Sequence, residues 1–502
     1  MCGIVAIFTN DPAKTAEHAE LSVRMLRHRG PDGIGALTIG RSEIAHARLA
    51  IVDVVGGAQP MLGEAGRTAL VCNGEIYNHA VIRDRLCSRH AFTSNSDSEA
   101  VLHLYEELGS HCPRQLDGMF AFFASDGEHF FAARDPLGIK PLYVGRDASG
   151  AVWLSSEIKA LHEQCTSFEV LPPGCSLTES SEITRWFKPP WLETVGTLRD
   201  FEVNEPLKRL ETAVVKRLMS DVPLGVFLSG GLDSSLVAAL AGRHLPKLKT
   251  FAVGVEGAPD LAAASRVARA LRTHHYERIY TPREAEGALE RVIYHLESYD
   301  PALIRSAVPS FFLSQFAAEH VKVVLTGEGA DELFAGYEYF KGFSEPGAVH
   351  RECARLIMGL HNMNLQRIDR MTMAHGLEGR VPFLDVALVE WAMSLDPKLK
   401  LQSELVPEKL PLRAASHGLL PSEIVWRTKQ QFSTGAGADH VLQTFAARVV
   451  SDSELAHAPE TFPIDTPSSK EAFLYRKIFE RDFPGESARK AVGRWLSAPI
   501  HS

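Results

Sequence analysis

Hydrophobic positions in residues 1–160 fall into short runs separated by turns, a pattern typical of β-strands. Clear runs occur at Ile4–Phe8, Ile44–Val55 and His129–Tyr143, and the last contains a tight Pro136-Leu137-Gly138 turn between two extended stretches. Short strands joined by turns pair with their neighbours along the chain. The pattern therefore predicts an antiparallel, β-rich N-terminal domain.

A different pattern begins after residues 176–202, an irregular stretch with Pro189-Pro190 that we interpret as a linker. The apolar run Val222–Leu228 is short enough for a buried strand and stops at Ser229-Gly230-Gly231. A helix-like stretch follows at Ser234–Ala241. The order strand, glycine turn, helix is typical of a βα unit in a parallel sheet.

Further strand and helix candidates alternate in the same way. Lys249–Val255 and Val321–Leu325 are strand-like, and Arg283–Glu297 carries apolar residues spaced for one helical face. Ligands of parallel α/β sheets bind at the carboxyl ends of the strands, where both glycine-rich loops of this chain fall. The rest of the chain reads as mostly helical. We predict a β-rich domain at residues 2–185 and an α/β domain at residues 203–502.

Composition excludes several classes of protein. The net charge is −9, so no general excess of Lys and Arg suggests a nucleic-acid-binding surface. No apolar stretch approaches the length of a membrane span, and the first apolar run is too short for the core of a signal peptide. The seven Cys form no CxxC pair, which indicates neither a disulfide framework nor a zinc knuckle. We expect a cytoplasmic protein.

Cys2 directly follows the initiator Met. Removal of Met1 would place a free α-amine, with a pKa of about 8, beside the thiol, so that the nucleophile would carry its own general base. Taken alone, Cys2 is more often a small buried residue at the start of a strand. Its context is an ordered set of motifs: Cys2-Gly3-Ile4, His28-Arg29-Gly30-Pro31-Asp32, Arg48-Leu49-Ala50-Ile51-Val52-Asp53, Asn73-Gly74-Glu75-Ile76-Tyr77-Asn78 and Ser96-Asp97.

This ordered set resembles the class II glutamine amidotransferase domain, which has the N-terminal nucleophile (αββα) fold, over residues 2–185. The resemblance implies that Cys2 attacks the glutamine amide, forming a glutamyl thioester and releasing ammonia. It also implies that the Asn73 side chain and the Gly74 backbone N–H stabilise the oxyanion. The forked guanidinium of Arg48 suits the α-carboxylate of glutamine. The remaining glutamine-binding candidates are Leu49, Ile51, Val52, Glu75 and Asp97, of which the two carboxylates suit the α-ammonium.

The loop Leu228-Ser229-Gly230-Gly231-Leu232-Asp233-Ser234-Ser235 follows the predicted strand. Backbone N–H groups at the start of a helix bind phosphate, and no Walker-type Gly-Lys-Ser/Thr follows. The loop resembles the pyrophosphate-binding loop of ATP pyrophosphatases. A plain glycine turn entering a helix is the alternative.

A second glycine-rich loop, Thr326-Gly327-Glu328-Gly329-Ala330-Asp331-Glu332-Leu333-Phe334, carries three carboxylates. Mg²⁺ is usually bound through one or two carboxylates and substrate phosphates. An acidic surface turn is the simpler alternative. Lys429 and Arg380, further along the chain, are candidates to neutralise phosphate charge during adenylation.

Together these segments resemble glutamine-hydrolysing asparagine synthetase over nearly the whole chain. The resemblance implies that Asp233 and Asp331 bind Mg²⁺, that Glu328 serves acyl-adenylate formation and the ammonia step, and that Lys429 stabilises the adenylation transition state. Arg305, Glu328 and Arg380 are the candidates for the acceptor substrate. The ATP-binding residues implied are Leu228, Ser229, Gly230, Gly231, Asp233, Ser234, Val253, Thr326 and Gly327.

The implied substrates are glutamine, aspartate and ATP. Aspartate would attack ATP to give β-aspartyl-AMP and pyrophosphate, and ammonia would cross inside the protein to displace AMP. One stretch departs from the family pattern: the two threonines that normally precede the conserved Arg are replaced by Ala302 and Leu303, with Arg305 kept. This replacement bears on the acceptor substrate.

Three alternatives stay open. The same machinery could act on another carboxylic acid in secondary metabolism. A class II amidotransferase acting on a sugar phosphate would lack the loop at 229–235, and a non-catalytic homologue would have lost Cys2 or Asp233, so both fit less well. The sequence does not set the oligomeric state, and a homodimer is one possibility.

Overall fold

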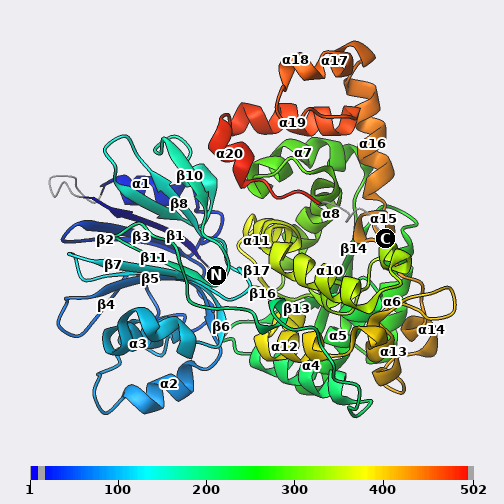
Figure 1. Cartoon of the computed structure of the whole chain (residues 1–502), viewed down its shortest axis with the longest axis horizontal. Coiled ribbons are helices and arrows are strands. Elements are labelled where there is room, and N and C mark those ends of the chain that lie inside the picture. Colours follow the sequence, from blue (N-terminus) through cyan, green and yellow to red (C-terminus); the bar gives the residue numbers. More distant parts are fainter. Residues whose placement is uncertain (1, 10–16, 496–502) are drawn as a thin grey trace.

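The N-terminal part of the computed structural model, which describes residues 2–9 and 17–495, contains two stacked antiparallel sheets (Figure 1). Each sheet has six strands. The first has the order β10 (Ser167–Val170), β8 (Tyr143–Arg146), β9 (Val152–Ser155), β1 (Gly3–Phe8), β3 (Ser42–Arg48), β2 (Gly33–Ile39). The second has the order β12 (Thr184–Arg185), β11 (Cys175–Thr178), β7 (Phe130–Arg134), β6 (Gly118–Ser125), β5 (Ala69–Ile76), β4 (Met61–Leu62).

Successive side chains along a strand point to opposite faces of its sheet, so each strand contributes to two packed layers. On β1, Ile4, Ala6 and Phe8 join the core between the two sheets, while Val5 and Ile7 face the layer of α1 (Glu17–Arg24). Helices α2 (His79–Leu86) and α3 (Asp97–Leu108) cover the outer face of the second sheet. The predicted αββα arrangement is confirmed.

The C-terminal part is built on a parallel sheet of five strands. Every pair in it is parallel. Its order is β15 (His274–Ile279), β14 (Lys249–Gly254), β13 (Leu224–Phe227), β16 (Val323–Leu325), β17 (Glu378–Arg380). This confirms the predicted parallel sheet.

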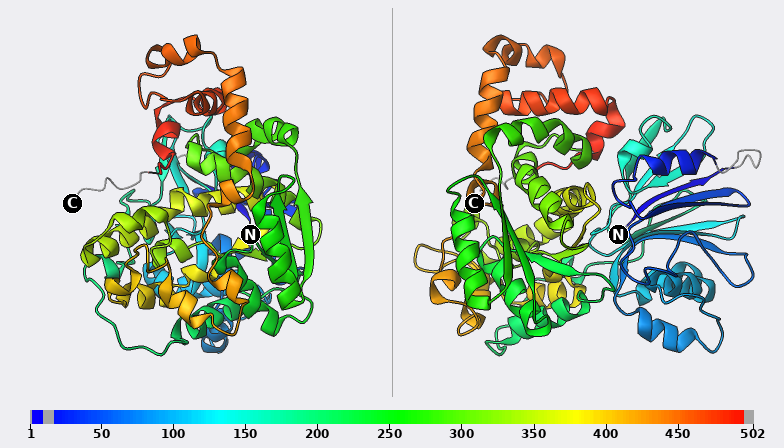
Figure 2. Two further views of the ribbon diagram at one scale, coloured as in Figure 1. Left: turned by 90° about the vertical axis from the view of Figure 1, so that its right-hand side faces the viewer. Right: turned by 180° about the vertical axis from the view of Figure 1, so that it is seen from behind.

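Helices surround this sheet, and the last of them stand above it as a separate tier, orange to red in Figures 1 and 2. Within the described residues, no helix is both long and apolar enough to cross a membrane. The helices are α4 (Glu205–Lys216), α5 (Leu232–His244), α6 (Pro259–Leu271), α7 (Pro282–Leu296), α8 (Pro301–Ala318), α9 (Ala330–Leu333), α10 (Pro346–Gly359), α11 (Asn364–Met373), α12 (Val386–Ser394), α13 (Leu410–Ala415), α14 (Ser422–Val425), α15 (Phe432–Gly435), α16 (Ala438–Val449), α17 (Asp452–Ala456), α18 (Ala458–Thr461), α19 (Lys470–Asp482) and α20 (Glu486–Ala491).

Three expectations about local structure need correction. The run Ile44–Val55 is a strand only as far as Arg48, because the Arg48 guanidinium binds the carbonyls of Asp53 and Val54 and folds the rest into a loop. The two stretches on either side of Pro136-Leu137-Gly138 become β7 and β8, which lie in different sheets and do not pair as a hairpin. Part of the expected linker forms β11 and β12.

A buried set of charges joins the two parts of the molecule at α11. The Arg29 guanidinium, fully buried, forms ion pairs with Glu157 at 2.6 Å and with Asp369 of α11 at 2.7 Å. Arg370 of α11 donates to the carbonyl oxygen of Ser156 at 3.0 Å. Buried charges are stable only when they are paired, so these contacts set where α11 lies against the antiparallel sheets.

Candidate active site

Cys2 directly precedes β1, and its side chain is buried. Its Sγ is 4.0 Å from the carbonyl oxygen of Leu49, and burial raises the pKa of the thiol. Met1 lies outside the described residues. The thiol faces a small cavity of about 30 Å³, which we call the Cys2 cavity. Its lining includes most of the predicted glutamine-binding residues: Arg48, Leu49, Ile51, Val52, Gly74, Glu75 and Asp97.

The Asn73 side chain is oriented by the nucleophile's own backbone. The Cys2 N–H donates to Asn73 Oδ1 at 3.0 Å. This contact fixes the amide so that its Nδ2 is buried without an acceptor among the described residues. A buried amide donor without a partner is costly in a resting structure. It is suited to a negative oxygen that appears only during a reaction.

Gly74 follows on the same strand. A Cβ there would lie 2.1 Å from the carbonyl oxygen of Met119 on β6, so only glycine allows the two strands to pair at this point. The close pairing keeps the Gly74 backbone at the wall of the Cys2 cavity. The structure thus places both predicted oxyanion donors beside Cys2.

Charged groups of both signs line the Cys2 cavity. The Arg48 guanidinium donates to the carbonyls of Asp53 at 2.7 Å and Val54 at 3.0 Å, which hold it in place. Asp97 Oδ2 accepts from the backbone N–H of Ile76 at 2.7 Å, and burial raises the pKa of both Asp97 and Glu75. A cavity lined by one guanidinium and two carboxylates suits a free amino acid, which carries an α-carboxylate and an α-ammonium group.

Arg380 belongs to this region rather than to the phosphate pocket where we expected it. Its fully buried guanidinium lies 3.2 Å from Glu75 and also pairs with Glu378. A further bond, 2.7 Å long, goes to the carbonyl oxygen of Arg217. The reason is that β17 is the sheet edge next to the antiparallel part, so its arginine neutralises carboxylates there.

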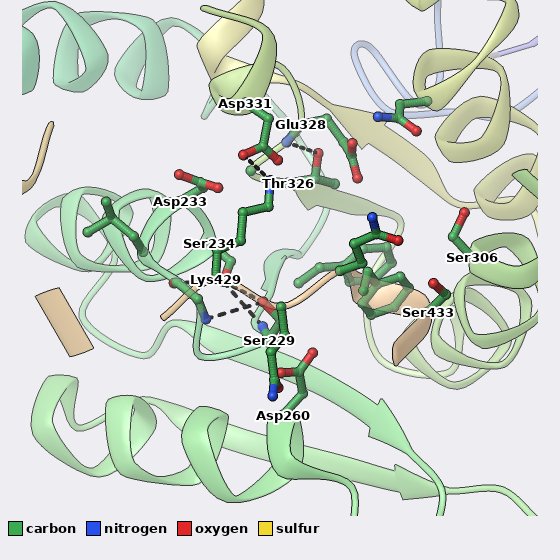
Figure 3. A pocket seen from close by; sticks show the side chains of 18 of the residues that line it. Ser229, Asp233, Ser234, Asp260, Ser306, Thr326, Glu328, Asp331, Lys429 and Ser433 are labelled. Carbon is green, nitrogen blue, oxygen red and sulfur yellow. Dashed lines mark hydrogen bonds and ion pairs between the residues drawn. The ribbon is translucent and has the colours of Figure 1, made fainter. Parts of the chain in front are cut away.

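A second and larger cavity, of about 260 Å³, lies at the carboxyl ends of β13, β14 and β16 (Figure 3). We call it the synthetase cavity. Eight of the nine ATP-binding candidates lie in its wall: Leu228, Ser229, Gly231, Asp233, Ser234, Val253, Thr326 and Gly327. Gly230, the ninth, does not line it.

Gly230 shapes the loop from behind. Its φ is +72°, and a Cβ there would lie 2.4 Å from the backbone of Ala263 on α6. The loop in front is held by Ser229 and Ser234, whose hydroxyls lie 3.1 Å apart. The Ser234 hydroxyl also accepts from the Ser229 N–H at 3.2 Å. The first turn of α5 therefore opens toward the cavity, as in a phosphate-binding loop.

Two carboxylates and two ammonium groups meet in the wall of the synthetase cavity, where Figure 3 shows Asp233, Asp331 and Lys429. Lys409 pairs with both Asp233 and Asp331, and Lys429 pairs with Asp331 and lies 4.4 Å from the Tyr337 ring. Although burial opposes ionisation, the two lysines hold the pKa of Asp331 below its usual range. The group combines anionic and cationic side chains in the wall of one cavity.

Lys409 was missed by sequence reasoning. It lies in the short stretch before α13, has no glycine loop beside it, and reaches Asp233 over 176 positions of sequence. Arg367 and Arg413 of the cavity wall were missed for the same reason. Only the fold brings them to the synthetase cavity.

Of the acceptor candidates Glu328 and Arg305, only Glu328 lines the synthetase cavity. Glu328 lines the synthetase cavity and pairs with Arg367 of α11. Arg305 is not among the residues lining the cavity, because its guanidinium forms two contacts with Glu471 of α19, one of 2.8 Å. The structure therefore does not place Arg305 in the wall of the synthetase cavity, and its role at the acceptor substrate stays a prediction.

Comparison with known proteins agrees with this geometry. A glutamine amidotransferase domain model matches residues 1–176, and an asparagine synthase model matches residues 206–346 and 341–498. A probable glutamine-hydrolysing asparagine synthetase from Dictyostelium discoideum is 43% identical over 99% of this chain and 96% of its own length. Glutamine-hydrolysing asparagine synthetases from Triphysaria versicolor (44% identical) and Arabidopsis thaliana (43% identical) each match 98% of this chain and 88% of their own length. This chain belongs to the glutamine-hydrolysing asparagine synthetase family.

Proposed function

We propose that this protein makes asparagine from aspartate, with glutamine as nitrogen donor and ATP converted to AMP and pyrophosphate. The observation that carries the proposal is the pairing of two cavities of different chemistry in one chain. One has a thiol and an unpaired amide donor, and the other has a phosphate-type loop facing an acid pair. The named relatives support the same reaction.

At the Cys2 cavity, the thiol sulfur would attack the side-chain amide carbon of glutamine. The amide oxygen would gain negative charge and be stabilised by Asn73 Nδ2 and the Gly74 N–H. Collapse of this intermediate would release ammonia, and water would then hydrolyse the thioester to glutamate. Arg48 would bind the α-carboxylate of glutamine, and Glu75 and Asp97 its α-ammonium.

At the synthetase cavity, the β-carboxylate of aspartate would attack the α-phosphorus of ATP and expel pyrophosphate. The loop N–H groups at Ser229–Ser234 would hold the phosphates, and Lys429 would neutralise charge that develops in the transition state. Adenylation is needed because a carboxylate is a poor acyl donor. Ammonia would then attack the β-acyl carbon and displace AMP, with Glu328 as the nearby carboxylate for the proton.

Asp233 and Asp331 fit a Mg²⁺ site. Asp233 Oδ1 is buried without a hydrogen-bond partner in the described part of the chain, and the carboxylate of Asp331 faces it across Lys409. Oxygen ligands from two carboxylates, completed by phosphates, suit this ion. Mg²⁺ bound there would draw negative charge from the phosphates of ATP.

A cytoplasmic location is also proposed. All seven cysteines are unpaired, which suits a reducing compartment. The oligomeric state, including the homodimer alternative, stays a prediction.

The acceptor end of the synthetase cavity is less polar than the family pattern suggests. Ala302 and Leu303 of α8 line it, where threonines would offer two hydroxyls. The neighbouring Ser306 and Ser310 also line it, but their hydroxyls donate to carbonyls of α8, at 3.0 Å to Leu303 and 2.8 Å to Ser306. This observation favours a second candidate, the same chemistry on a less polar carboxylic acid.

The two half-reactions should separate by mutation. We expect Cys2→Ala to abolish synthesis from glutamine and keep synthesis from ammonium, since the synthetase cavity is untouched. Asp233→Asn should strongly reduce synthesis from either nitrogen source and spare glutamine hydrolysis. Assays of glutamate, asparagine, AMP and pyrophosphate check both, and ADP with phosphate as products would exclude the adenylate mechanism.

Asn73 offers a sharper test of the glutamine site. Asn73→Asp keeps the oxygen that accepts from Cys2 but removes the Nδ2 donor, whereas Asn73→Ala removes both. We expect both variants to lower kcat for glutamine hydrolysis by about 10²–10³-fold, the usual effect of losing one oxyanion donor. Ammonium-dependent synthesis is the internal control. If Asn73→Asp retains full glutaminase activity, Nδ2 does not bind the oxyanion.

The acceptor can be tested by restoring the hydroxyls. We expect the double variant Ala302→Thr, Leu303→Thr to lower KM for aspartate roughly fivefold or more, because each recovered buried hydrogen bond is worth about 1–3 kcal/mol. Ala302→Val with Leu303→Val has the same shape without the hydroxyls and is the matched control. If the threonines bring no gain and a less polar acid outcompetes aspartate in the unmodified protein, the second candidate replaces the first.

A further inference from the structure

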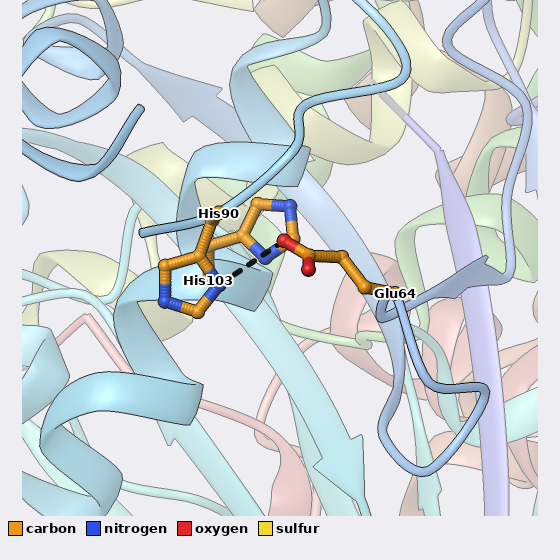
Figure 4. A group of neighbouring side chains, drawn as sticks. All are labelled: Glu64, His90 and His103. Carbon is orange, nitrogen blue, oxygen red and sulfur yellow. Dashed lines mark ion pairs between the residues drawn. The ribbon is translucent and has the colours of Figure 1, made fainter. Parts of the chain in front are cut away.

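Two histidines and two glutamates converge at the outer edge of the N-terminal part, away from both cavities. Glu64 lies in the turn between β4 and β5, His90 in the turn after α2, and His103 and Glu106 on α3. Figure 4 shows the Glu64 carboxylate directed at the two imidazole rings. We call these four residues the His–Glu cluster.

The spacing of the donor atoms suits a metal ion. His90 Nδ1 is 3.5 Å from Glu64 Oε1 and 3.5 Å from Glu106 Oε2. Ligands of tetrahedral Zn²⁺ at about 2.0–2.1 Å from the metal lie about 3.3–3.4 Å from one another. One donor atom each from Glu64, His90 and His103 lies within 4.8 Å of the others. Glu106 lies beside this group of three, with its Oε2 2.8 Å from His103 Nδ1.

The far nitrogen of each imidazole faces another carboxylate. His90 Nε2 is 3.1 Å from Glu107, and His103 Nε2 is 3.7 Å from Glu99. Glu99 is fixed by bonds from the backbone and hydroxyl groups of Thr93 and Ser94. Metal-binding histidines almost always direct their second nitrogen at such a partner, which orients the ring. Glu99 and Glu107 are therefore positioned to orient the two imidazole rings, although neither belongs to the His–Glu cluster.

The burial of His103 and the charge balance of the cluster also favour a bound cation. The His103 side chain is only 1% exposed, and its Nδ1 lies 2.8 Å from Glu106 Oε2 within the cluster. Glu64 and Glu106 form ion pairs with histidine but with no Lys or Arg in the described chain. Neutral imidazoles would leave two carboxylate charges here without a counter-ion, and a divalent cation would balance them.

We propose that the His–Glu cluster is a structural Zn²⁺ site. Nitrogen and carboxylate ligands in a tetrahedral arrangement are typical of zinc. The ion would join the β4–β5 turn to α3, which already approach so closely that a Cβ at Gly63 would lie 2.1 Å from Glu106 Oε1. The cluster residues are not among those lining either cavity, so their role is positioning.

The elements joined by this site carry the glutamine-binding residues. Strand β5 leads from the turn to Asn73 and Gly74, and α3 begins at Asp97. Zinc bound at the outer ends of both elements would restrict their movement relative to each other. We expect metal removal to lower the melting temperature of the protein and to raise KM for glutamine more than KM for aspartate.

The test is a Zn²⁺ titration of the metal-stripped full-length protein against a chromophoric chelator. We expect one tight site, weakened more than about 100-fold in His90→Gln and in His103→Gln, because losing even an outer-shell partner costs 10–100-fold. Each variant is measured separately because His103 is buried and His90 is less so. Zn²⁺ should raise the melting temperature of the unmodified protein but not of either variant.

Two controls separate this site from other metal binding. Cys87→Ser removes an exposed thiol near His90 and should keep the tight site, as should Asp233→Asn in the synthetase cavity. The Co²⁺-loaded protein should show tetrahedral visible bands without a thiolate charge-transfer band. If the unmodified protein binds Zn²⁺ no more tightly than both histidine variants, or if a thiolate band appears, the cluster is a set of His–Glu ion pairs only and the proposal is wrong.

Discussion

The arrangement of the whole molecule depends on one buried guanidinium, that of Arg29. It pairs with Asp369 on α11 and with Glu157, while its Nε donates to the carbonyl oxygen of Cys2 at 3.0 Å. Removing one partner of a buried ion pair typically costs about 3–5 kcal/mol, because a charge is left in a dry environment. The halves of the protein are therefore fixed in the single orientation that satisfies these charges.

That orientation connects the two cavities through α11. Asp369 faces the Arg29 contact with Cys2, and two residues earlier Arg367 pairs with Glu328 in the wall of the synthetase cavity. One helix of ten residues thus touches the surroundings of both reactions. The arrangement suits the transfer of ammonia within the protein, since ammonia released into water at neutral pH is mostly protonated and no longer a nucleophile.

Local sequence patterns predicted those parts of the fold in which the interacting residues are close together in the chain. The strand, glycine turn and helix at 222–241 appear as β13 and α5, and four of the five ordered motifs contribute residues to the Cys2 cavity. The failures concern long-range contacts. Arg380 and Arg305 carry the right charge, but Glu75, Glu378 and Glu471 compete for them, and the sequence does not reveal such partners. Lys409 reaches Asp233 only through the tertiary fold.

If ammonia crosses the interface fixed by Arg29 inside the protein, nitrogen isotopes will show it. The protein would be given aspartate, ATP and glutamine labelled with ¹⁵N at the amide, together with a large excess of unlabelled ammonium. Mass spectrometry of the asparagine formed should show the glutamine label essentially undiluted, because ammonia made at Cys2 does not mix with the solvent pool. Dilution of the label in proportion to the free ammonium would mean that ammonia reaches the synthetase cavity through the solvent, and that no internal transfer takes place.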